Sequence, residues 1–302
     1  MNANSGLSGF GQFFISGLLM RYWAFSICMI FNRFKNNLYW FVNYKAGCLN
    51  VIFAAMNRYA HDAVTPLEHS SLSKKEQVAG MFDDIAGRYD LLNRVLSGGI
   101  DRGWRKKALA ELELSALSTL LDVASGTADV AIMAAEKFRN IQITGIDISE
   151  GMLDIGRQKI KSRKLENTIS LMLADSESIP FEDNHFDAVT VAFGVRNFQH
   201  LEKGLSEIRR VLKPGGKLVV LEFSKPENRI FLPVYQAYRK WIAPGIGSLL
   251  SKQKKAYQYL DKSIEKFPEG KVFLNVLTAV GFKHTYLKKL SLGICSIYCG
   301  NK

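Results

Sequence analysis

The sequence predicts a doubly wound α/β domain of the Rossmann-like type, with a mainly parallel sheet and an antiparallel closing strand. Short apolar runs alternate with segments of helical period, as is typical of a parallel sheet with crossover helices. A tight turn of small residues follows the first run, and an acidic residue stands at the end of each of the next two. We therefore expect these residues at the edge where open α/β sheets bind ligands.

Five apolar runs are the predicted strands of the parallel sheet, and three amphipathic segments between them are the predicted helices. The strands are expected at Thr119–Ala124, Ile141–Ile148, Ile169–Ala174, Ala188–Phe193 and Lys217–Phe223, and the helices at 129–138, 150–164 and 201–212.

Further elements are predicted before and after these strands and helices in the sequence. Ser73 and Glu76 have the spacing of a capping box at the start of a helix that covers Glu76–Tyr89. A second helix is expected at Trp104–Leu112. After the core come an aromatic and basic insertion at 225–267, a helix at Gly270–Val280, and closing strands at Lys283–Lys289 and Gly293–Cys299.

Residues 1–55 differ in composition from the rest of the chain, because they are rich in aromatic residues and asparagine and contain no acid. The stretch Leu7–Phe31 is apolar enough to suggest a membrane anchor, but Arg21 lies near its middle. The simpler interpretation is a start assigned too early, with Met56 as the true first residue. We expect one domain at 56–302 behind an atypical, disordered or wrongly included extension.

The chain is basic, with a net charge of +12 over 302 residues. The first 55 residues supply four of these charges, so the remainder still carries +8. This surplus suits an anionic partner such as a membrane surface, a nucleic acid or an acidic cosubstrate, or it is simply a solvated lysine-rich surface. The predicted strands are apolar runs of the kind that are buried. A nucleic-acid-binding sheet would instead expose interleaved aromatic and basic residues, so that function is disfavoured.

The cysteines and histidines indicate no metal site, because none has a ligand-like spacing. Cys295 and Cys299 lie four residues apart in a predicted strand, too far apart to bridge. Reduced thiols of this kind fit a cytoplasmic protein.

The strongest functional signal is the segment Leu121–Asp129, which passes from an apolar strand through a turn of small residues to a helix start. Small residues let the backbone approach a ligand closely. Asp147 ends the next strand about 20 residues later, as expected of a carboxylate that binds ribose hydroxyls, although such an Asp can also cap a helix. Asp175 occupies the equivalent position at the end of the third predicted strand. The pyrophosphate glycines of a nicotinamide-dependent oxidoreductase are missing.

These segments, together with Ile179–Asp187 and Leu212–Gly216, resemble the class I methyltransferases that bind S-adenosylmethionine. Tyr89–Trp104, Ala192–Asn197 and Arg210–Ser224 are similar to signatures of the ubiquinone and menaquinone C-methyltransferases. By this resemblance Thr127 and the neighbouring backbone of Ser125 and Gly126 line the methionine moiety, Asp147 binds the ribose, Asp175 and Ser176 bind the adenine, and Ala192 contacts the cofactor.

The chain departs from the family pattern at four positions. Asp101 stands where the family usually has His, Ser125 and Ala128 replace glycines of the loop, and Ala192 replaces a common Ser. These differences put in doubt the cofactor contact at Ala192 and any role for a base at Asp101.

The resemblance implies C-methylation of a quinol, for which the ring carbon must be made nucleophilic. Arg196 is our candidate to stabilise the phenolate, because it follows the fourth strand; the alternative is a structural pair with an acid. Tyr89, Asn93 and Asp101 are candidates for a lid over the substrate. They could equally be a core residue, a helix cap and a solvated loop charge.

The expected substrate is demethylmenaquinol, a prenylated naphthoquinol, which the enzyme would convert to menaquinol in the last step of menaquinone synthesis. The alternative substrate is the ubiquinone precursor or another lipidic small molecule. The aromatic and basic residues at Arg229–Lys255 suit a prenyl tail or peripheral contact with the inner face of the membrane, or a helix with a solvated basic face. The sequence leaves the oligomeric state open.

Overall fold

The computed structural model describes residues 59–67, 69–226 and 254–302. The chain divides into two units, Met1–Asn57 and Arg58–Lys302, and all the described residues belong to the second. The extension expected at 1–55 and most of the insertion expected at 225–267 lie outside the described residues. Among the residues described, no helix is both long and apolar enough to cross a membrane.

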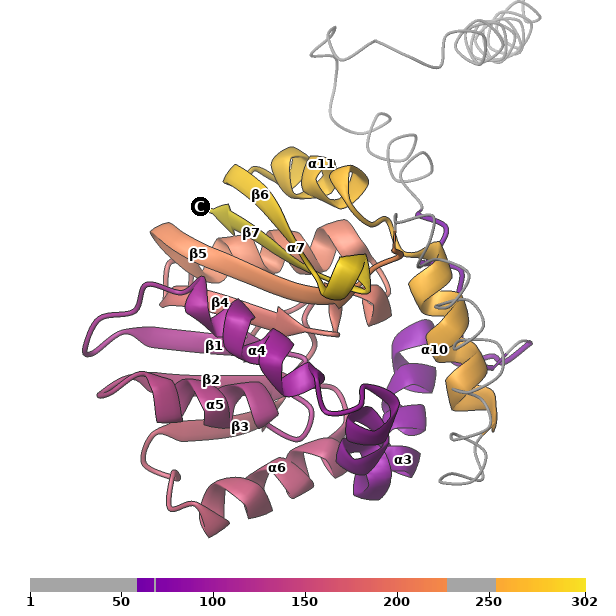
Figure 1. Ribbon diagram of the computed structural model, residues 1–302, viewed down its shortest axis with the longest axis horizontal. Coiled ribbons are helices and arrows are strands. Elements are labelled where there is room, and N and C mark those ends of the chain that lie inside the picture. The colour runs from indigo at the N-terminus through magenta and orange to yellow at the C-terminus, as the bar shows by residue number, and fades with distance from the viewer. Residues whose placement is uncertain (1–58, 68, 227–253) are drawn as a thin grey trace, which may run out of the picture. The chain divides into compact units, whose positions relative to one another are not determined.

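A seven-stranded sheet forms the centre of the domain, in the order β3-β2-β1-β4-β5-β7-β6 (Figure 1). The first five strands are parallel, and β7 runs antiparallel to both β5 and β6. The predicted fold class is therefore confirmed. The strands are β1 (Thr119–Val123), β2 (Gln142–Asp147), β3 (Ile169–Leu173), β4 (Phe186–Ala192), β5 (Leu212–Phe223), β6 (Lys283–Leu290) and β7 (Cys295–Asn301).

Helices cover both faces of the sheet (Figure 1). One apolar core lies between the sheet and α4 and α5, and a second lies between the sheet and α7 and α11. Because both faces are covered, the central strands β1 and β4 are almost continuously buried. The helices are α3 (Lys74–Leu96), α4 (Asp101–Ala110), α5 (Asp129–Lys137), α6 (Glu150–Ser162), α7 (Leu201–Val211), α10 (Lys254–Lys266) and α11 (Lys271–Val280).

Helix α3 forms as predicted at its start and is longer than predicted at its end. The capping box is present, since the Ser73 side chain accepts from the backbone N–H of Glu76 and the Glu76 side chain accepts from that of Ser73. The helix continues past Tyr89 to Leu96 and contacts α6. Its extra turns place Asn93 inside the helix, so Asn93 is not a helix cap.

Strand β5 begins five residues earlier than expected. The Pro-Gly-Gly turn at Lys213–Gly216, which precedes the strand start predicted at Lys217, lies within the bounds of β5, opposite a register shift between Phe186 and Ala188 in β4. Gly215 has a φ of +78°, a conformation that favours glycine. The turn therefore forms an irregularity at the start of the strand.

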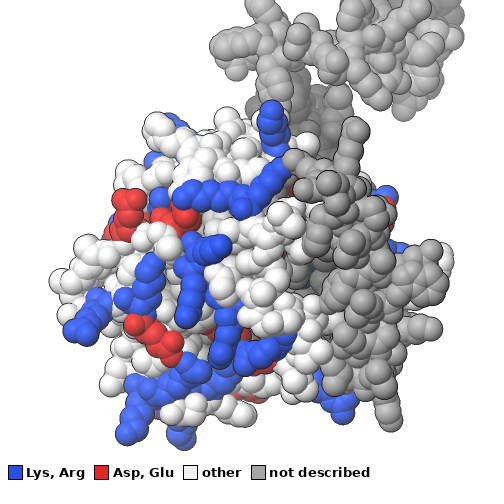
Figure 2. All heavy atoms as spheres, in the orientation of Figure 1, with Lys and Arg blue, Asp and Glu red and all other residues white. Residues whose placement is uncertain are grey.

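Lysine and arginine side chains are spread over the face of the domain formed by α4, α5 and α6 (Figure 2). Arg102, Lys106 and Lys107 of α4 are exposed, as are Lys137 of α5 and Lys161 of α6. The surplus positive charge predicted from the composition therefore includes a basic face on this side of the sheet. Cys295 and Cys299 are both buried in β7 as free thiols, as predicted.

Gly145 is the point at which β2 and the loop after β1 approach too closely for a side chain. A Cβ atom there would lie 2.5 Å from Cδ2 of Leu171 and 2.7 Å from Oγ of Ser125. We expect Gly145→Ala to lower the free energy of unfolding by about 1–3 kcal/mol, because neighbouring groups must shift. Denaturant unfolding measures this loss. Gly80→Ala is the matched control, since Gly80 is exposed within α3 with open space around it, and it should be neutral or stabilising. Equal losses in the two variants would contradict the steric argument.

Candidate active site

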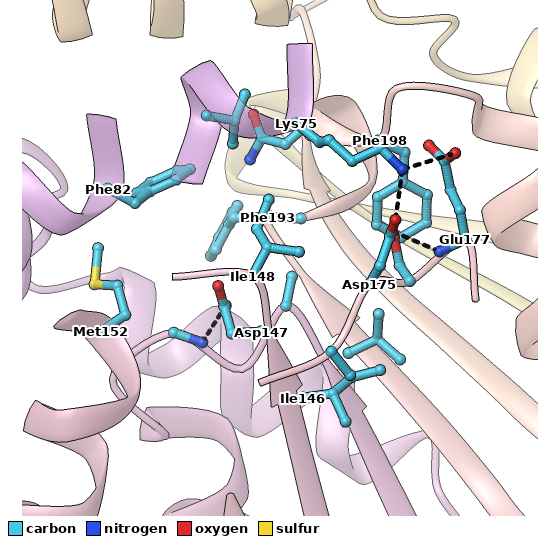
Figure 3. A pocket seen from close by; sticks show the side chains of 18 of the residues that line it. Lys75, Phe82, Ile146, Asp147, Ile148, Met152, Asp175, Glu177, Phe193 and Phe198 are labelled. Atoms are coloured by element: carbon cyan, nitrogen blue, oxygen red, sulfur yellow. Dashed lines mark hydrogen bonds and ion pairs between the residues drawn. The ribbon is translucent and has the colours of Figure 1, made fainter. Parts of the chain in front are cut away.

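A pocket of about 680 Å³, including its opening to solvent, lies at the carboxyl ends of the parallel strands, with α3 on one side (Figure 3). Six of the predicted site residues line it: Tyr89, Gly126, Asp147, Asp175, Ser176 and Ala192. Ser125, Thr127, Asn93, Asp101 and Arg196 are not among the lining residues.

The loop after β1 is shaped by left-handed backbone conformations. Ala124, Gly126 and Ala128 all have positive φ values, of 55°, 55° and 63°. Between the first two, the Ser125 backbone N–H donates to the carbonyl of Ile146 and its hydroxyl donates to Asp122 at 2.8 Å. The loop therefore adopts its tight shape although alanine stands at Ala128, where the family has glycine.

Asp147 lies at the pocket wall and holds this loop. Its carboxylate accepts from the backbone N–H of Gly126 at 2.8 Å and from that of Ser149 at 2.9 Å. Burial raises the pKa of Asp147, and these backbone hydrogen bonds oppose that rise. Ser149 is itself the N-cap of α6, because its side chain accepts from the N–H of Met152. Asp147 is therefore not needed as the helix cap and remains placed to meet a ligand.

On another side of the pocket, the structure pairs the predicted adenine carboxylate with a residue that sequence analysis did not single out. Nζ of Lys75 lies 2.5 Å from Oδ2 of Asp175 and 3.7 Å from Oε2 of Glu177 (Figure 3). The hydrogen bond to Asp175 raises the pKa of Lys75. Only the position of Lys75 at the start of an amphipathic helix could have indicated this contact. Lys75 therefore ties α3 to the loop that carries Asp175 and Glu177.

Thr127 is buried and its hydroxyl is already occupied by protein groups. It donates to Asp90 of α3 at 2.6 Å and accepts from Lys159 of α6 at 3.0 Å. Lys159 also binds Asp90 and Asp129. This network joins α3 to the start of α5, and the Ser125 hydroxyl is likewise engaged, with Asp122. Direct cofactor contacts by Ser125 and Thr127 stay predictions.

Arg196 forms a buried ion pair with Glu222 of β5. Its Nη1 donates to Glu222 at 2.6 Å and to the carbonyl of Phe193 at 2.7 Å, and both charged side chains are almost fully buried. Burial raises the pKa of Glu222, and the charge of Arg196 opposes that rise. This geometry matches the alternative in which Arg196 pairs with an acid; a role in turnover stays a prediction. A glutamate within an otherwise apolar, buried strand was the signal that could have identified Glu222.

Tyr89 and Asn93 lie in α3 and Asp101 begins α4, so both helices extend beyond their predicted bounds. Tyr89 lines the pocket; burial raises the pKa of its hydroxyl, and a hydrogen bond from Asn93 opposes that rise. Asp101 is not a solvated loop charge, because it is buried in the first turn of α4. Ser97 and Arg105 both donate to its carboxylate.

Asp122 lies within the predicted loop segment Leu121–Asp129 and was not among the predicted site residues. It is fully buried at the end of β1 and accepts from Ser125 and from Thr190 of β4, at 2.8 and 2.7 Å. Burial raises its pKa to about 6, against these two hydrogen bonds. Asp122 therefore holds the loop against the neighbouring strand.

The residues of the pocket fit S-adenosylmethionine. Asp147 presents a carboxylate that suits ribose hydroxyls, and Gly126 lets the backbone come close to the ligand. Phe82, Ile148 and Met152 supply apolar surface on the side away from Asp175 (Figure 3). The pocket thus combines few polar groups with apolar walls, as small-molecule sites do.

We expect Asp147→Ala to abolish measurable binding of S-adenosylhomocysteine while the domain stays folded. Hydrogen bonds to a charged group are worth about 1.5–3 kcal/mol each, and the partly exposed Asp147 contributes little to the apolar core. Isothermal titration and thermal unfolding measure the two effects. Asp154→Ala, an exposed aspartate of α6, is the control and should bind normally. Unchanged affinity in the Asp147 variant would remove the ribose assignment.

Solved structures with the same fold include a [4+2]-cyclase, SpnF, with a TM-score of 0.57, 20% identity, and coverage of 76% of this chain and 96% of that one. Another is a methyltransferase from Thermotoga maritima, titled a possible histamine N-methyltransferase, with a TM-score of 0.53 and 16% identity, covering 74% of this chain and 99% of that one. At these identities the similarity shows the fold alone.

Sequence relatives are much more similar to the chain. A demethylmenaquinone methyltransferase of Bacteroides fragilis is 46% identical over 244 residues, covering 81% of this chain and 99% of the relative. A ubiquinone/menaquinone biosynthesis C-methyltransferase UbiE of Geotalea daltonii is 45% identical over 230 residues, covering 76% and 97%. The profile described as the ubiE/COQ5 methyltransferase family matches residues 70–302. The chain therefore belongs to the ubiE/COQ5 methyltransferase family and uses S-adenosylmethionine as its methyl donor.

Proposed function

We propose that the protein methylates demethylmenaquinol on a ring carbon to give menaquinol, the last step of menaquinone synthesis. The observation that carries this proposal is the 46% identity with a protein named demethylmenaquinone methyltransferase over nearly its whole length. The alternative substrate is the ubiquinone precursor. Relatives that are 45% identical and named for both quinone pathways support that alternative.

When bound, S-adenosylmethionine supplies a methyl group already activated by its sulfonium, and the sulfur keeps the electron pair of the broken bond. The protein then has to align a nucleophilic ring carbon and exclude water. In our proposal α3 covers the pocket and presents Phe82 and Tyr89 to it. The ring carbon that gains the methyl group loses its proton, which restores the aromatic ring.

Arg196 has the chemistry to stabilise the negative oxygen of the ionised quinol. Glu222 and the carbonyl of Phe193 hold its Nη1, while its Nε–H has no hydrogen-bond partner among the described residues. A fixed guanidinium in a poorly hydrated site stabilises developing charge more strongly than a mobile one in water. In our proposal Glu222 therefore orients Arg196, and Arg196 binds the quinol oxygen.

Contact with a membrane would give this enzyme access to a prenylated substrate. The corner between α3 and α4 exposes Leu91, Val95 and Ile100 next to the exposed Arg94 and Arg102. Apolar side chains beside cations suit the surface of an anionic bilayer. Peripheral attachment at this corner is part of the proposal. Most of the segment Arg229–Lys255, where such contact was expected from the sequence, lies outside the described residues.

The proposed activity predicts menaquinol as the product when purified protein is incubated with S-adenosylmethionine and reduced demethylmenaquinol. We expect the reduced ubiquinone precursor to react much more slowly. Product mass and rate with each reduced quinone are measured under the same conditions. Equal rates would assign the broader substrate range, and no product from either quinol would contradict the proposed function.

We expect loss of the Arg196 guanidinium to lower kcat by a factor on the order of 10²–10³, with little change in affinity for S-adenosylhomocysteine. Because Arg196→Ala leaves Glu222 buried without its partner, the informative variants are Arg196→Lys and the pair Arg196→Gln with Glu222→Gln. Lysine should restore activity in part, since it keeps the charge but not the planar fork. Raised pH should partly rescue the paired variant by ionising the quinol in solution.

The control for these variants is Arg139→Gln, which removes an exposed arginine after α5 and should leave kcat unchanged. Rates are divided by the concentration of enzyme that binds S-adenosylhomocysteine. If cofactor affinity is lost while the rate per bound enzyme is unchanged, Arg196 has only a structural role.

A further inference from the structure

Two buried guanidinium–carboxylate pairs flank one pair of aromatic rings near the pocket. Arg105 pairs with Asp101, and its Cζ lies 5.6 Å from the ring centroid of Phe193. Arg196 pairs with Glu222, and its Cζ lies 5.4 Å from the centroid of Phe223. The two rings lie 4.6 Å apart with an angle of 33° between their planes. The Arg105 pair therefore repeats the arrangement of the Arg196 pair.

Both arginines have a donor that the protein does not use. Arg105 is 5% exposed and Arg196 is 4% exposed, and neither Nε–H has a hydrogen-bond partner within the described part of the chain. Native proteins rarely leave a buried donor unsatisfied, and each such case calls for an explanation. Two oxygens of a bound ligand, one at each arginine, would satisfy the two donors.

The position of the two arginines relative to the pocket supports this explanation. Phe193, over which Arg105 lies, is itself a lining residue of the pocket. The charges of Arg196 and Arg105 both act on the hydroxyl of Tyr89, another lining residue, and lower its pKa against the effect of burial. Arg196 donates to the carbonyl of Phe193 and Arg105 lies over its ring, so both guanidinium groups contact this lining residue from behind, although neither arginine lines the pocket itself.

We propose that Arg105, held by Asp101 and Phe193, is a second substrate-binding arginine, which binds the quinol oxygen remote from the methylated carbon while Arg196 binds the nearer oxygen. This inference rests on the proposed function, because it concerns how the same site recognises a quinol. A quinol has two oxygens on opposite edges of its ring, whereas a simple phenol has one. Two fixed arginines would therefore select a dihydroxylated ring.

In this proposal Asp101, which stands where the family usually has His, holds the Arg105 guanidinium in place. It accepts from Ser97 at 2.9 Å and from Arg105, so its charge fixes the guanidinium four residues later on the same helix. The alternative is that Arg105 only joins α4 to α5, since its Nη1 also lies 3.9 Å from Oδ2 of Asp129. In that case its loss would alter stability but not the choice between substrates.

The test compares two acceptors: reduced demethylmenaquinol with a shortened prenyl chain, and the matching naphthol that lacks the hydroxyl remote from the methylation site. Two variants are informative. Arg105→Lys keeps a charge beside Asp101 and removes the Nε–H, and the pair Asp101→Asn with Arg105→Gln leaves no lone buried charge. Arg102→Gln, an exposed arginine on the same helix, is the control.

We expect both variants to bind S-adenosylhomocysteine as the wild type does and to lose kcat/KM for the quinol by roughly 10-fold or more. Their kcat/KM for the naphthol should change little, so the ratio between the two acceptors falls. The control should keep the wild-type ratio. Using the ratio removes the difference in intrinsic reactivity between the two acceptors.

The inference is overturned if the ratio is unchanged in both variants, or if both lose cofactor binding together with their folded state, because Arg105 would then be a structural residue. A wild-type protein that methylates neither acceptor would instead contradict the proposed function.

Discussion

The site depends on the attachment of α3 to the carboxyl edge of the sheet by polar contacts at three points. Lys75 binds Asp175, Asp83 accepts from Ser149 at 2.6 Å, and Asp90 binds Lys159. The three contacts end on the loop after β3, on the N-cap of α6 and on the last turn of α6. The helix that covers the pocket is thus held by segments beside the pocket, and charges such as those of Lys75 and Asp175 attract at short range in a partly dehydrated environment.

Most of the fold could be predicted from the sequence because its signals are local. Alternating apolar runs and helical periods gave the order of strands and helices, and the capping box at Ser73 marked the start of α3. The positions of Gly126, Asp147 and Asp175 around one pocket followed from the rule that parallel strands end at the same edge.

Pairings between distant residues could not be predicted in the same way. Glu222 and Arg196 are 26 residues apart, and Lys75 and Asp175 are 100 residues apart, so no spacing rule connects them. Whether a side chain such as Thr127 faces the ligand or a neighbouring helix depends on packing around the loop, which one sequence does not reveal. The length of α3 was underestimated for a related reason: its last turns carry exposed apolar residues that break the helical period.

The loop after β1 has a further consequence for ligand binding in the pocket. Ala124 and Ala128 adopt a conformation that costs an alanine roughly 1–2 kcal/mol, and Ala128 is fully buried beside Gly156. At positive φ this cost exceeds the backbone entropy that an alanine saves relative to glycine, so the contacts around the loop must hold it in this conformation. Its shape is then set by the surrounding packing before any ligand arrives. Such pre-organisation reduces the ordering cost of association, so more of the contact energy appears as affinity.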